Sequence, residues 1–266
     1  MRTLVLLAAA LGASAVFSGP LAAKIAEKYK VSKTDVWYGG ERTVFDFEGY
    51  EAWVVEPPAG VKPADGRPWT WTMQWKTAFV PRTSVPRLLK MGYHHVTVDT
   101  FTHHMDATGL AVSKRFQDYL VGELALAPKA RLIGLSWGGF FSIRYAANFP
   151  DRVARIYLDA PLLCFDAFRQ MPPEWESQKP ASGWWTDSPE MPINMTTPIA
   201  HARIPILLLY GGVDMVVPPI RNAELFAGRF KAAGGDIKVV CRKNYAHHPH
   251  GVEESESTII DFFEGR

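Results

Sequence analysis

The segment Gly134-Leu135-Ser136-Trp137-Gly138 constrains the fold of this chain more than any other feature, because of the residues that flank it. A short apolar run, residues 130–133, precedes the segment, and a helix-like run, residues 139–147, follows it. Glycines on either side of a serine allow a strand and a helix to meet in a sharp turn that exposes the hydroxyl group. The helix that follows directs its N-terminal N–H groups at the same place. A bare G-x-S-x-G recurs by chance, but here both flanking segments are those that a nucleophilic serine requires.

An acid that could orient a base for Ser136 lies downstream. Residues 204–210 form an apolar run typical of a buried parallel strand, and Asp214 follows it on a loop with two glycines. A carboxylate in this place can hold the imidazole of a histidine in one tautomer. Asp214 is therefore the candidate acid. The alternative is that its carboxylate has only a structural role on the approach to the next helix. Asp236 and Asp261 fit less well, because neither follows a strand on a glycine-rich loop.

A base is expected in the histidine-rich segment that follows the next strand, at residues 237–241. The segment contains His247, His248 and His250. The chain order is then serine, acid, histidine, which differs from the order in the chymotrypsin and subtilisin folds.

With these segments in place, the chain resembles the α/β-hydrolase superfamily. More narrowly, it resembles secreted bacterial esterases and prolyl-oligopeptidase-like hydrolases with a Gly-His-His-Pro-His-like segment. The resemblance covers residues 37–263 and implies Ser136 as nucleophile, Asp214 as acid and His247 as base, the first histidine after a small residue. Ala246 stands where the family usually has glycine, so His248 and His250 stay open as alternatives.

The expected fold class is α/β, with the α/β-hydrolase fold that the resemblance implies. Strand-like and helix-like segments alternate, which predicts a mostly parallel sheet of about eight strands flanked by helices. The sheet is expected to begin with an antiparallel pair, because residues 36–47 and 51–56 alternate aromatic and polar side chains.

Two backbone N–H groups are needed to stabilise the oxyanion of an acyl-transfer reaction. One is expected from Trp137, the residue after the nucleophile. The other is expected from the loop after the strand at residues 69–73, with Gln74 preferred among Met73, Gln74 and Trp75. Five side chains are candidates for lining the substrate pocket: Trp75, His103, Trp184, Trp185 and His248.

Residues 161–203 form a long insertion that is rich in proline and tryptophan and lacks clear periodicity. Such a stretch in a compact domain is usually functional. Because it lies between two strands that end near Ser136, we expect a small lid over the pocket. Its tryptophans either stack on a sugar ring or an aromatic acyl group, or pin the insertion to the sheet.

The composition is that of an ordinary globular chain. With 266 residues, the chain is long enough for one α/β domain. The formal net charge of +2 gives no reason to expect nucleic acid or a membrane surface as a partner. The sequence does not predict the oligomeric state.

Residues 1–23 have the features of a secretory signal peptide: a positive start, an apolar run and small residues at the end. Cleavage is expected near 13–15 or 21–23, which leaves the domain at 24–266 in a secreted or periplasmic protein. An uncleaved anchor helix is the alternative, although the apolar run is short for a bilayer.

No metal and no cofactor are expected. The chain has eight histidines, but no pair has the spacing of H-E-x-x-H, and the cysteines lie far apart. Cys164 and Cys241 either form a bridge or act as small apolar side chains.

The expected function is that of a secreted serine hydrolase that acts through an acyl-enzyme, on a carbohydrate-linked or other small ester. A serine peptidase of the prolyl-oligopeptidase type is one alternative. A non-catalytic binding protein on the same fold is the other.

Overall fold

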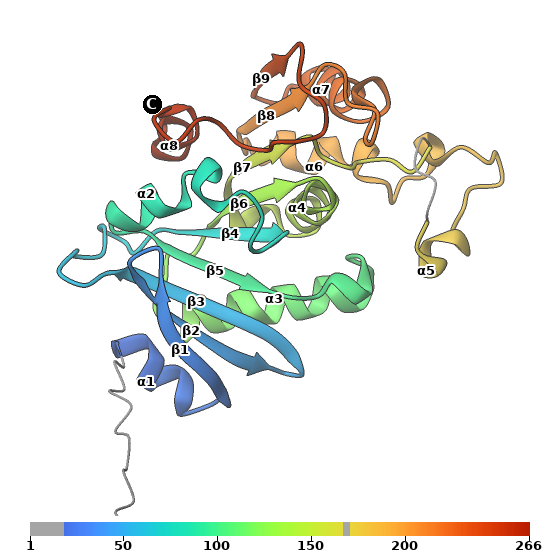
Figure 1. Cartoon of the computed structure of the whole chain (residues 1–266). Helices are drawn as coiled ribbons and strands as arrows, with labels where there is room; N and C mark the ends of the chain where they lie inside the picture. Colours follow the sequence, from blue (N-terminus) through green and yellow to red (C-terminus); the bar gives the residue numbers. More distant parts are fainter. Residues whose placement is uncertain (1–18, 167–170) are drawn as a thin grey trace, which may run out of the picture.

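The computed structural model describes residues 19–166 and 171–266, so residues 1–18 of the expected signal peptide lie outside the described part. Within these ranges nine strands form one sheet in the order β1-β2-β3-β5-β4-β6-β7-β8-β9 (Figure 1). The strands are β1 (Val31–Trp37), β2 (Gly40–Phe47), β3 (Tyr50–Pro58), β4 (Trp69–Gln74), β5 (His94–Val98), β6 (Ala130–Leu135), β7 (Val153–Asp159), β8 (Ile206–Gly211) and β9 (Ile237–Arg242).

The antiparallel start of the sheet contains one strand more than the sequence predicted. The expected single strand at residues 36–47 is wrong: β1 ends at Trp37, β2 begins at Gly40, and the two pair with each other. Tyr38 and Gly39 form the turn, with φ of 48° and 87°. Gly39 adopts a positive φ without steric cost. The pair Gly39-Gly40 marks this turn in the sequence, and the single strand predicted for residues 36–47 ran across that signal.

The remaining six strands are parallel to one another, as the alternation of strands and helices predicted. Every residue of β4, β5 and β8 is buried, because helices cover both faces of the sheet. The helices are α1 (Pro20–Ala26), α2 (Val85–Lys90), α3 (Ala107–Gly122), α4 (Trp137–Asn148), α5 (Pro173–Glu176), α6 (Thr196–His201), α7 (Ala223–Ala232) and α8 (Thr258–Glu264).

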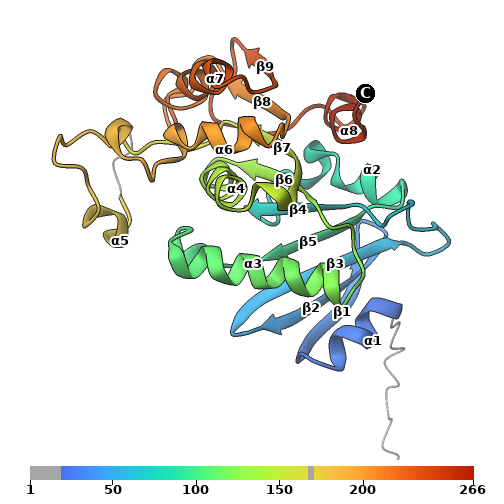
Figure 2. The ribbon, with the colours of Figure 1, turned by 180° about the vertical axis from the view of Figure 1, so that it is seen from behind.

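The helices form two layers with separate apolar clusters. Buried side chains of α2 and α8 pack on one face of the sheet. Those of α1, α3, α4, α6 and α7 pack on the other (Figures 1 and 2). No helix in the described part of the chain is long and apolar enough to cross a membrane.

The parallel strands bring three residues predicted from the sequence, and Asp159 with them, to one edge of the sheet. Ser136 directly follows β6, Asp159 ends β7, and Asp214 follows β8. His247 lies on the loop after β9. Since neighbouring parallel strands end at the same edge, these four positions come together although 111 residues separate the first from the last.

The insertion after β7 packs on the start of α4 and contains two short helices, α5 and α6. Phe165 stacks on Phe140 with ring centroids 5.2 Å apart, and Trp175 meets Phe140 edge-on at the same distance. The indole N–H of Trp175 donates to the carbonyl oxygen of His104 at 3.1 Å. These contacts fix part of the insertion to the loop after β5 and to the helix that follows Ser136.

The cysteines are free thiols in the described chain, with Cys164 buried and Cys241 exposed. The alternative of two unbridged side chains therefore describes them.

Two buried histidines on β5 predict a loss of stability in mild acid. Burial lowers the pKa of His95 to about 3, and burial together with Arg67 lowers that of His94 to about 4. In the unfolded chain both have pKa values near about 6.5. Below that pH the unfolded state binds more protons than the folded state, so stability falls as the pH drops. Between pH 7 and pH 5 each histidine should lower the free energy of unfolding by about 2 kcal/mol.

Urea unfolding midpoints at the two pH values measure this loss. A His95→Gln variant should lose clearly less stability on acidification than the wild type, because one of the two groups no longer titrates. His201→Gln is the control, because His201 is exposed on α6. An equal acid-induced loss in the wild type and in His95→Gln would contradict the prediction.

Candidate active site

Ser136 occupies a strained turn between β6 and α4. Its φ of 50° and ψ of −117° are unusual for a residue with a side chain, and such conformations cost about 1–3 kcal/mol. Three backbone hydrogen bonds hold the turn. The Ser136 N–H donates to the Asp159 carbonyl at 3.0 Å, and the N–H groups of Gly139 and Leu162 both donate to the Ser136 carbonyl at 2.9 Å. The turn therefore depends on β7 as well as on its own strand and helix.

The glycines of the motif are needed because backbones approach closely here. A Cβ atom at Gly134 would lie 2.6 Å from the Ser142 hydroxyl oxygen and 2.7 Å from the Gly138 carbonyl oxygen. A Cβ atom at Gly138 would overlap the carbonyl oxygen of Gln74. The end of β4 thus lies directly against the first turn of α4.

The structure brings Ser136, His247 and Asp214 into one hydrogen-bonded chain. His247 Nε2 lies 3.0 Å from Ser136 Oγ, and His247 Nδ1 lies 2.7 Å from Asp214 Oδ2. All three side chains are buried. A carboxylate only accepts hydrogen bonds, so Nδ1 carries the proton and the lone pair of Nε2 faces the serine hydroxyl. This tautomer can accept a proton from Ser136.

Asp214 is held as a carboxylate. Burial on its own would raise the pKa of Asp214, but hydrogen bonds from His247 and from two backbone N–H groups outweigh it and lower the pKa below its usual value. The backbone donors are Val216 at 2.8 Å and Val217 at 2.9 Å, both to Oδ1. One oxygen therefore anchors the loop and the other orients the imidazole.

The other two histidines of the segment have different surroundings. His248 is exposed and stacks on Phe79 with centroids 5.4 Å apart. Burial of part of the ring, then the neighbouring His250 and His247, lower the pKa of His248. His250 is buried and lies 3.2 Å from Asp159. Of the three, His247 is the one that contacts both Ser136 and Asp214.

Asp159 is a buried carboxylate near the site that the sequence analysis missed. It accepts hydrogen bonds from the Tyr157 hydroxyl at 2.8 Å, from Arg242 Nη2 at 2.7 Å and from the Gly251 N–H at 2.7 Å, and it contacts His250 Nδ1. A buried carboxylate needs such partners, because an unpaired charge in the interior is costly. Asp159 ends an apolar strand, and a charged residue at the end of such a strand is the signal that could have found it, although it lacks the glycine-rich loop that identified Asp214.

Arg242 ties the histidine loop to the same carboxylate. Its Nη1 donates to the carbonyl oxygens of Pro249 at 3.2 Å and Gly251 at 2.7 Å, while its Nη2 pairs with Asp159. The loop that carries His247 is therefore held at the ends of β7 and β9 through charge-assisted hydrogen bonds.

The two expected oxyanion donors lie beside the nucleophile. Trp137 is the first residue of α4, whose N-terminus carries partial positive charge. Gln74 ends β4 and pairs in register with Gly134, two residues before Ser136. Burial alone would raise the pKa of the nearby Asp99, but Lys76, which donates to it at 2.9 Å, outweighs burial and lowers that pKa, with a smaller contribution from the Gln74 side chain.

Aromatic side chains next to these donors form what we call the aromatic wall, made of Trp75, Phe101, His104 and Trp137. Phe101 lies 4.7 Å from Trp75 and 5.9 Å from Trp137, and His104 lies 5.1 Å from Trp137 between ring centroids. Trp75 was predicted from the sequence as a pocket residue, whereas Phe101 was not. Trp75 is exposed, so the wall has a surface that a substrate can reach.

Three other pocket candidates make their contacts elsewhere. Trp185 is only 1% exposed and packs on Phe165 at 5.4 Å, so its expected role in lining an open pocket is wrong. Trp184 is 54% exposed, with the Arg221 guanidinium 6.0 Å from its ring. His103 Nε2 lies 2.8 Å from the Tyr50 hydroxyl. Trp185 therefore fixes the insertion to the core, while Trp184 stays at its surface.

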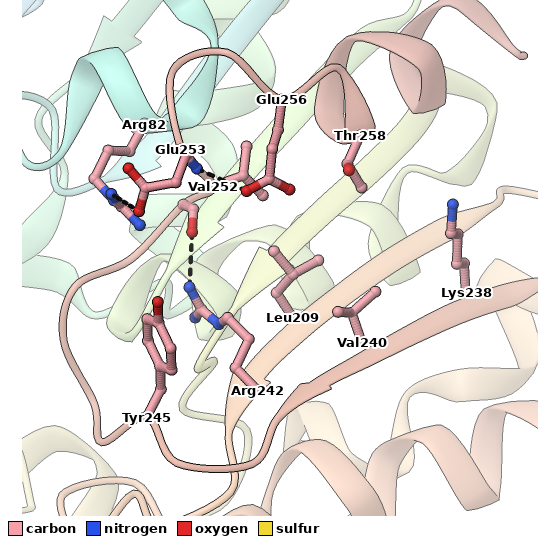
Figure 3. Close-up of a pocket in the computed structure, with 11 residues that line it drawn as sticks. Arg82, Leu209, Lys238, Val240, Arg242, Tyr245, Val252, Glu253, Glu256 and Thr258 are labelled. Atoms are coloured by element: carbon pink, nitrogen blue, oxygen red, sulfur yellow. Dashed lines mark hydrogen bonds and ion pairs between the residues drawn. The ribbon is translucent and has the colours of Figure 1, made fainter.

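A cavity of about 320 Å³ lies beside the histidine loop, but it is not the site of Ser136 (Figure 3). Arg242, Tyr245 and Val252 of the loop line it together with residues of β8, β9 and the approach to α8. Figure 3 shows the Arg82–Glu253 ion pair, at 2.7 Å, across its rim. None of the triad side chains lines this cavity.

Comparisons with known proteins agree with the architecture. Residues 102–189 match the family described as alpha/beta hydrolase fold. A stretch of 137 residues is 28% identical to acylamino-acid-releasing enzyme 2 of Oryza sativa subsp. japonica, covering 46% of this chain and 18% of that enzyme. The chain thus matches less than a fifth of the length of this curated relative.

Solved structures extend the likeness to most of the described domain. An S-formylglutathione hydrolase from Agrobacterium tumefaciens superposes with a TM-score of 0.61 at 16% identity, over 82% of this chain and 92% of that one. An acylaminoacyl peptidase from Pyrococcus horikoshii gives a TM-score of 0.54 at 14% identity, over 84% of this chain and 38% of that one. At such identities the likeness concerns the fold. The chain has the α/β-hydrolase fold.

Proposed function

We propose that the protein is a serine hydrolase that cleaves a carboxylic ester through an acyl-enzyme. The observation that supports this most is the chain of contacts from Ser136 Oγ to His247 Nε2 at 3.0 Å and from His247 Nδ1 to Asp214 at 2.7 Å. A nucleophile, a base and an orienting acid at hydrogen-bond distance are what acyl transfer requires.

The proposed reaction has two halves. His247 Nε2 takes the Ser136 proton while Oγ attacks the ester carbonyl, and Asp214 stabilises the imidazolium that forms. The tetrahedral oxyanion then collapses, the bond to the alcohol breaks, and His247 returns the proton to the departing oxygen. A water molecule repeats the sequence on the acyl-enzyme, with its proton passing through His247 to Ser136 as the acid leaves.

The oxyanion is stabilised by backbone N–H groups. Trp137 supplies one from the start of α4, and Gln74 or the next residue supplies the other from the end of β4. Each such donor contributes about 3 kcal/mol to transition-state stabilisation in acyl-transfer enzymes. Because the end of β4 lies against Gly138, the separation of the two donors is fixed by backbone packing.

A small or carbohydrate-linked ester is the proposed substrate class. The aromatic wall offers Trp75 as a surface on which a sugar ring or an aromatic acyl group can stack. Peptide cleavage is the second candidate, because the relative from Oryza sativa is named as an acylamino-acid-releasing enzyme.

A fluorophosphonate probe and a substrate panel test the function together. The probe should label Ser136 in the wild type. A binding protein without a reactive serine would not be labelled. The panel contains acetyl, feruloyl and methyl-glucuronoyl esters and acyl-peptides. Faster turnover of acyl-peptides than of every ester would replace the esterase assignment by the peptidase one, and absence of labelling would refute both.

Asp214→Asn should lower kcat by about 10⁴-fold in a folded protein, because the amide would favour the wrong imidazole tautomer. Steady-state kinetics on the best ester measure the loss, and circular dichroism checks the fold. Asp236→Asn is the matched control, since Asp236 is an exposed carboxylate before β9. If Asp236→Asn is the damaging change instead, Asp214 is not the acid.

We also propose secretion or export to the periplasm, with cleavage before α1. The candidate site at residues 21–23 lies inside α1, where Leu21, Ala22 and Ile25 are buried. Cutting there would remove packed side chains, so the site near residues 13–15 is preferred. N-terminal sequencing of the exported protein tests this, and a mature chain that begins inside α1 would refute it.

A further inference from the structure

The three imidazoles of the histidine loop are gathered more closely than the proposed catalysis requires. One ring nitrogen of each of His247, His248 and His250 lies within 4.8 Å of those of the other two. The ring centroids form a nearly equilateral triangle with sides of 4.7, 4.9 and 4.8 Å. Only His247 has a part in moving the Ser136 proton, so the triangle calls for another explanation.

His250 presents a buried nitrogen that nothing satisfies. Its Nδ1 faces the Asp159 carboxylate at 3.2 Å, and a carboxylate only accepts, so Nδ1 carries the proton. Its Nε2 then carries no proton and can only accept a hydrogen bond or bind a cation. In the described chain this atom is buried without a hydrogen-bond partner, and the residue is 1% exposed. A buried acceptor without a donor is costly, and a cation would satisfy it.

Each buried imidazole of the triangle is backed by a carboxylate. Asp214 holds Nδ1 of His247, and Asp159 holds Nδ1 of His250, which leaves both Nε2 atoms as donors of electron pairs. Histidines that bind metals usually have this arrangement, in which a carboxylate fixes the tautomer and raises the basicity of the ligand nitrogen. The exposed His248 completes the set from the solvent side.

We propose that His247, His248 and His250 form a binding site for a zinc-class transition-metal dication, and that occupation of this site switches hydrolysis off. The regulatory part rests on the proposed function, while the binding part does not. Imidazole nitrogens suit zinc and its neighbours, whereas magnesium and calcium prefer oxygen ligands.

The geometry is compatible with such an ion after small ring movements. Zinc–nitrogen bonds of about 2.0–2.1 Å in a tetrahedral site place ligand nitrogens about 3.3 Å apart. The nitrogens here lie within 4.8 Å of one another, so a bound ion requires them to approach by up to about 1.5 Å. A fourth position would fall to water or to the Ser136 hydroxyl, which lies 3.0 Å from His247 Nε2.

Binding and catalysis exclude each other because they need the same lone pair. His247 Nδ1 is occupied by Asp214, so Nε2 is the nitrogen left for a metal. Nε2 is also the atom that must accept the Ser136 proton. An imidazole that binds a cation through Nε2 cannot act as a base there, so zinc should inhibit rather than support turnover.

Zinc binding is measured first in a Ser136→Ala background, where no hydrolysis is needed for the readout. Competition with a chromophoric chelator should give one zinc per chain. Adding His248→Ala should weaken binding by at least about tenfold, the size of effect seen when a metal site loses a supporting group. His201→Ala is the matched control, an exposed histidine on α6 whose loss should not change the affinity. Magnesium should not compete.

Inhibition is then measured on the wild type with the best ester of the panel. Zinc should inhibit, EDTA should restore full activity, and His248→Ala should need at least about tenfold more zinc for the same inhibition. Equal zinc affinity with and without the His248 imidazole would refute the proposed three-histidine site. Activity that EDTA abolishes and zinc restores would overturn the inhibitory role. If no ester is cleaved but His248-dependent zinc binding is found, the proposed function fails and the site stands.

Discussion

Ser136→Ala should reduce kcat for the ester substrate by about 10⁵- to 10⁶-fold, the loss expected when the nucleophile of a triad is removed. Without Oγ no acyl-enzyme forms, and His247 has no proton to accept. The oxyanion donors remain, so the variant should still hydrolyse the ester somewhat faster than the uncatalysed reaction in water. Single-turnover and steady-state assays with the same ester give the ratio, and fluorophosphonate labelling should disappear in parallel.

The fold should survive this change. Ser136 lies in a turn, and its hydroxyl bonds only to His247 among the described residues. Alanine meets the same strain at a φ of 50° as serine does. Ser142→Ala is the matched control: this buried serine of α4 donates to the Gly138 carbonyl at 2.7 Å and should keep turnover. A near-wild-type kcat in Ser136→Ala would contradict the proposal that Ser136 is the nucleophile.

His247→Ala should be damaging to a similar degree, because base and nucleophile act as one unit. Its imidazole is the one that lies between Ser136 Oγ and Asp214. His248→Ala should keep measurable turnover, since that ring is exposed and rests on Phe79. His250→Ala should fall between the two, because it removes a contact to the buried Asp159.

The ranking of the three variants is the measurement that decides the base. kcat is determined for each on one ester, with thermal unfolding to show that each protein is folded. Free imidazole should restore part of the activity of His247→Ala alone. If His248→Ala is the inactive variant and His247→Ala turns over, the base is His248 and the contacts described here are not the catalytic ones.

The parallel half of the sheet was predictable because strands that are buried on both faces consist of continuous apolar residues. The apolar runs at residues 130–133 and 204–210 overlap β6 and β8, with ends that differ by up to two residues. The turn at Gly39 left a weaker signal, the pair Gly39-Gly40, and the strand predicted for residues 36–47 ran across it although β1 and β2 are separate strands.

The partners of buried charged residues could not be predicted from the sequence, for a different reason. Asp159 and Arg242 lie 83 residues apart and meet because β7 and β9 flank β8 in the sheet. Periodicity reports that a residue is buried and does not report which strand lies beside it. Likewise, Trp184 and Trp185 are neighbours in sequence with opposite exposure, and the single 3₁₀ turn that begins at Trp185 is too short to leave a periodic pattern in the sequence.

Asp159 connects the nucleophile and the base through two different groups of one residue. Its backbone carbonyl accepts from the Ser136 N–H, and its carboxylate accepts from the Gly251 N–H in the histidine loop. The distance between Oγ and Nε2 therefore depends on the end of β7 as well as on the hydrogen bond from His247 to Asp214. For enzyme engineering, this means that exposed side chains of the insertion and the aromatic wall, such as Trp184 and Trp75, can be exchanged to change substrate preference while the reacting pair keeps its spacing.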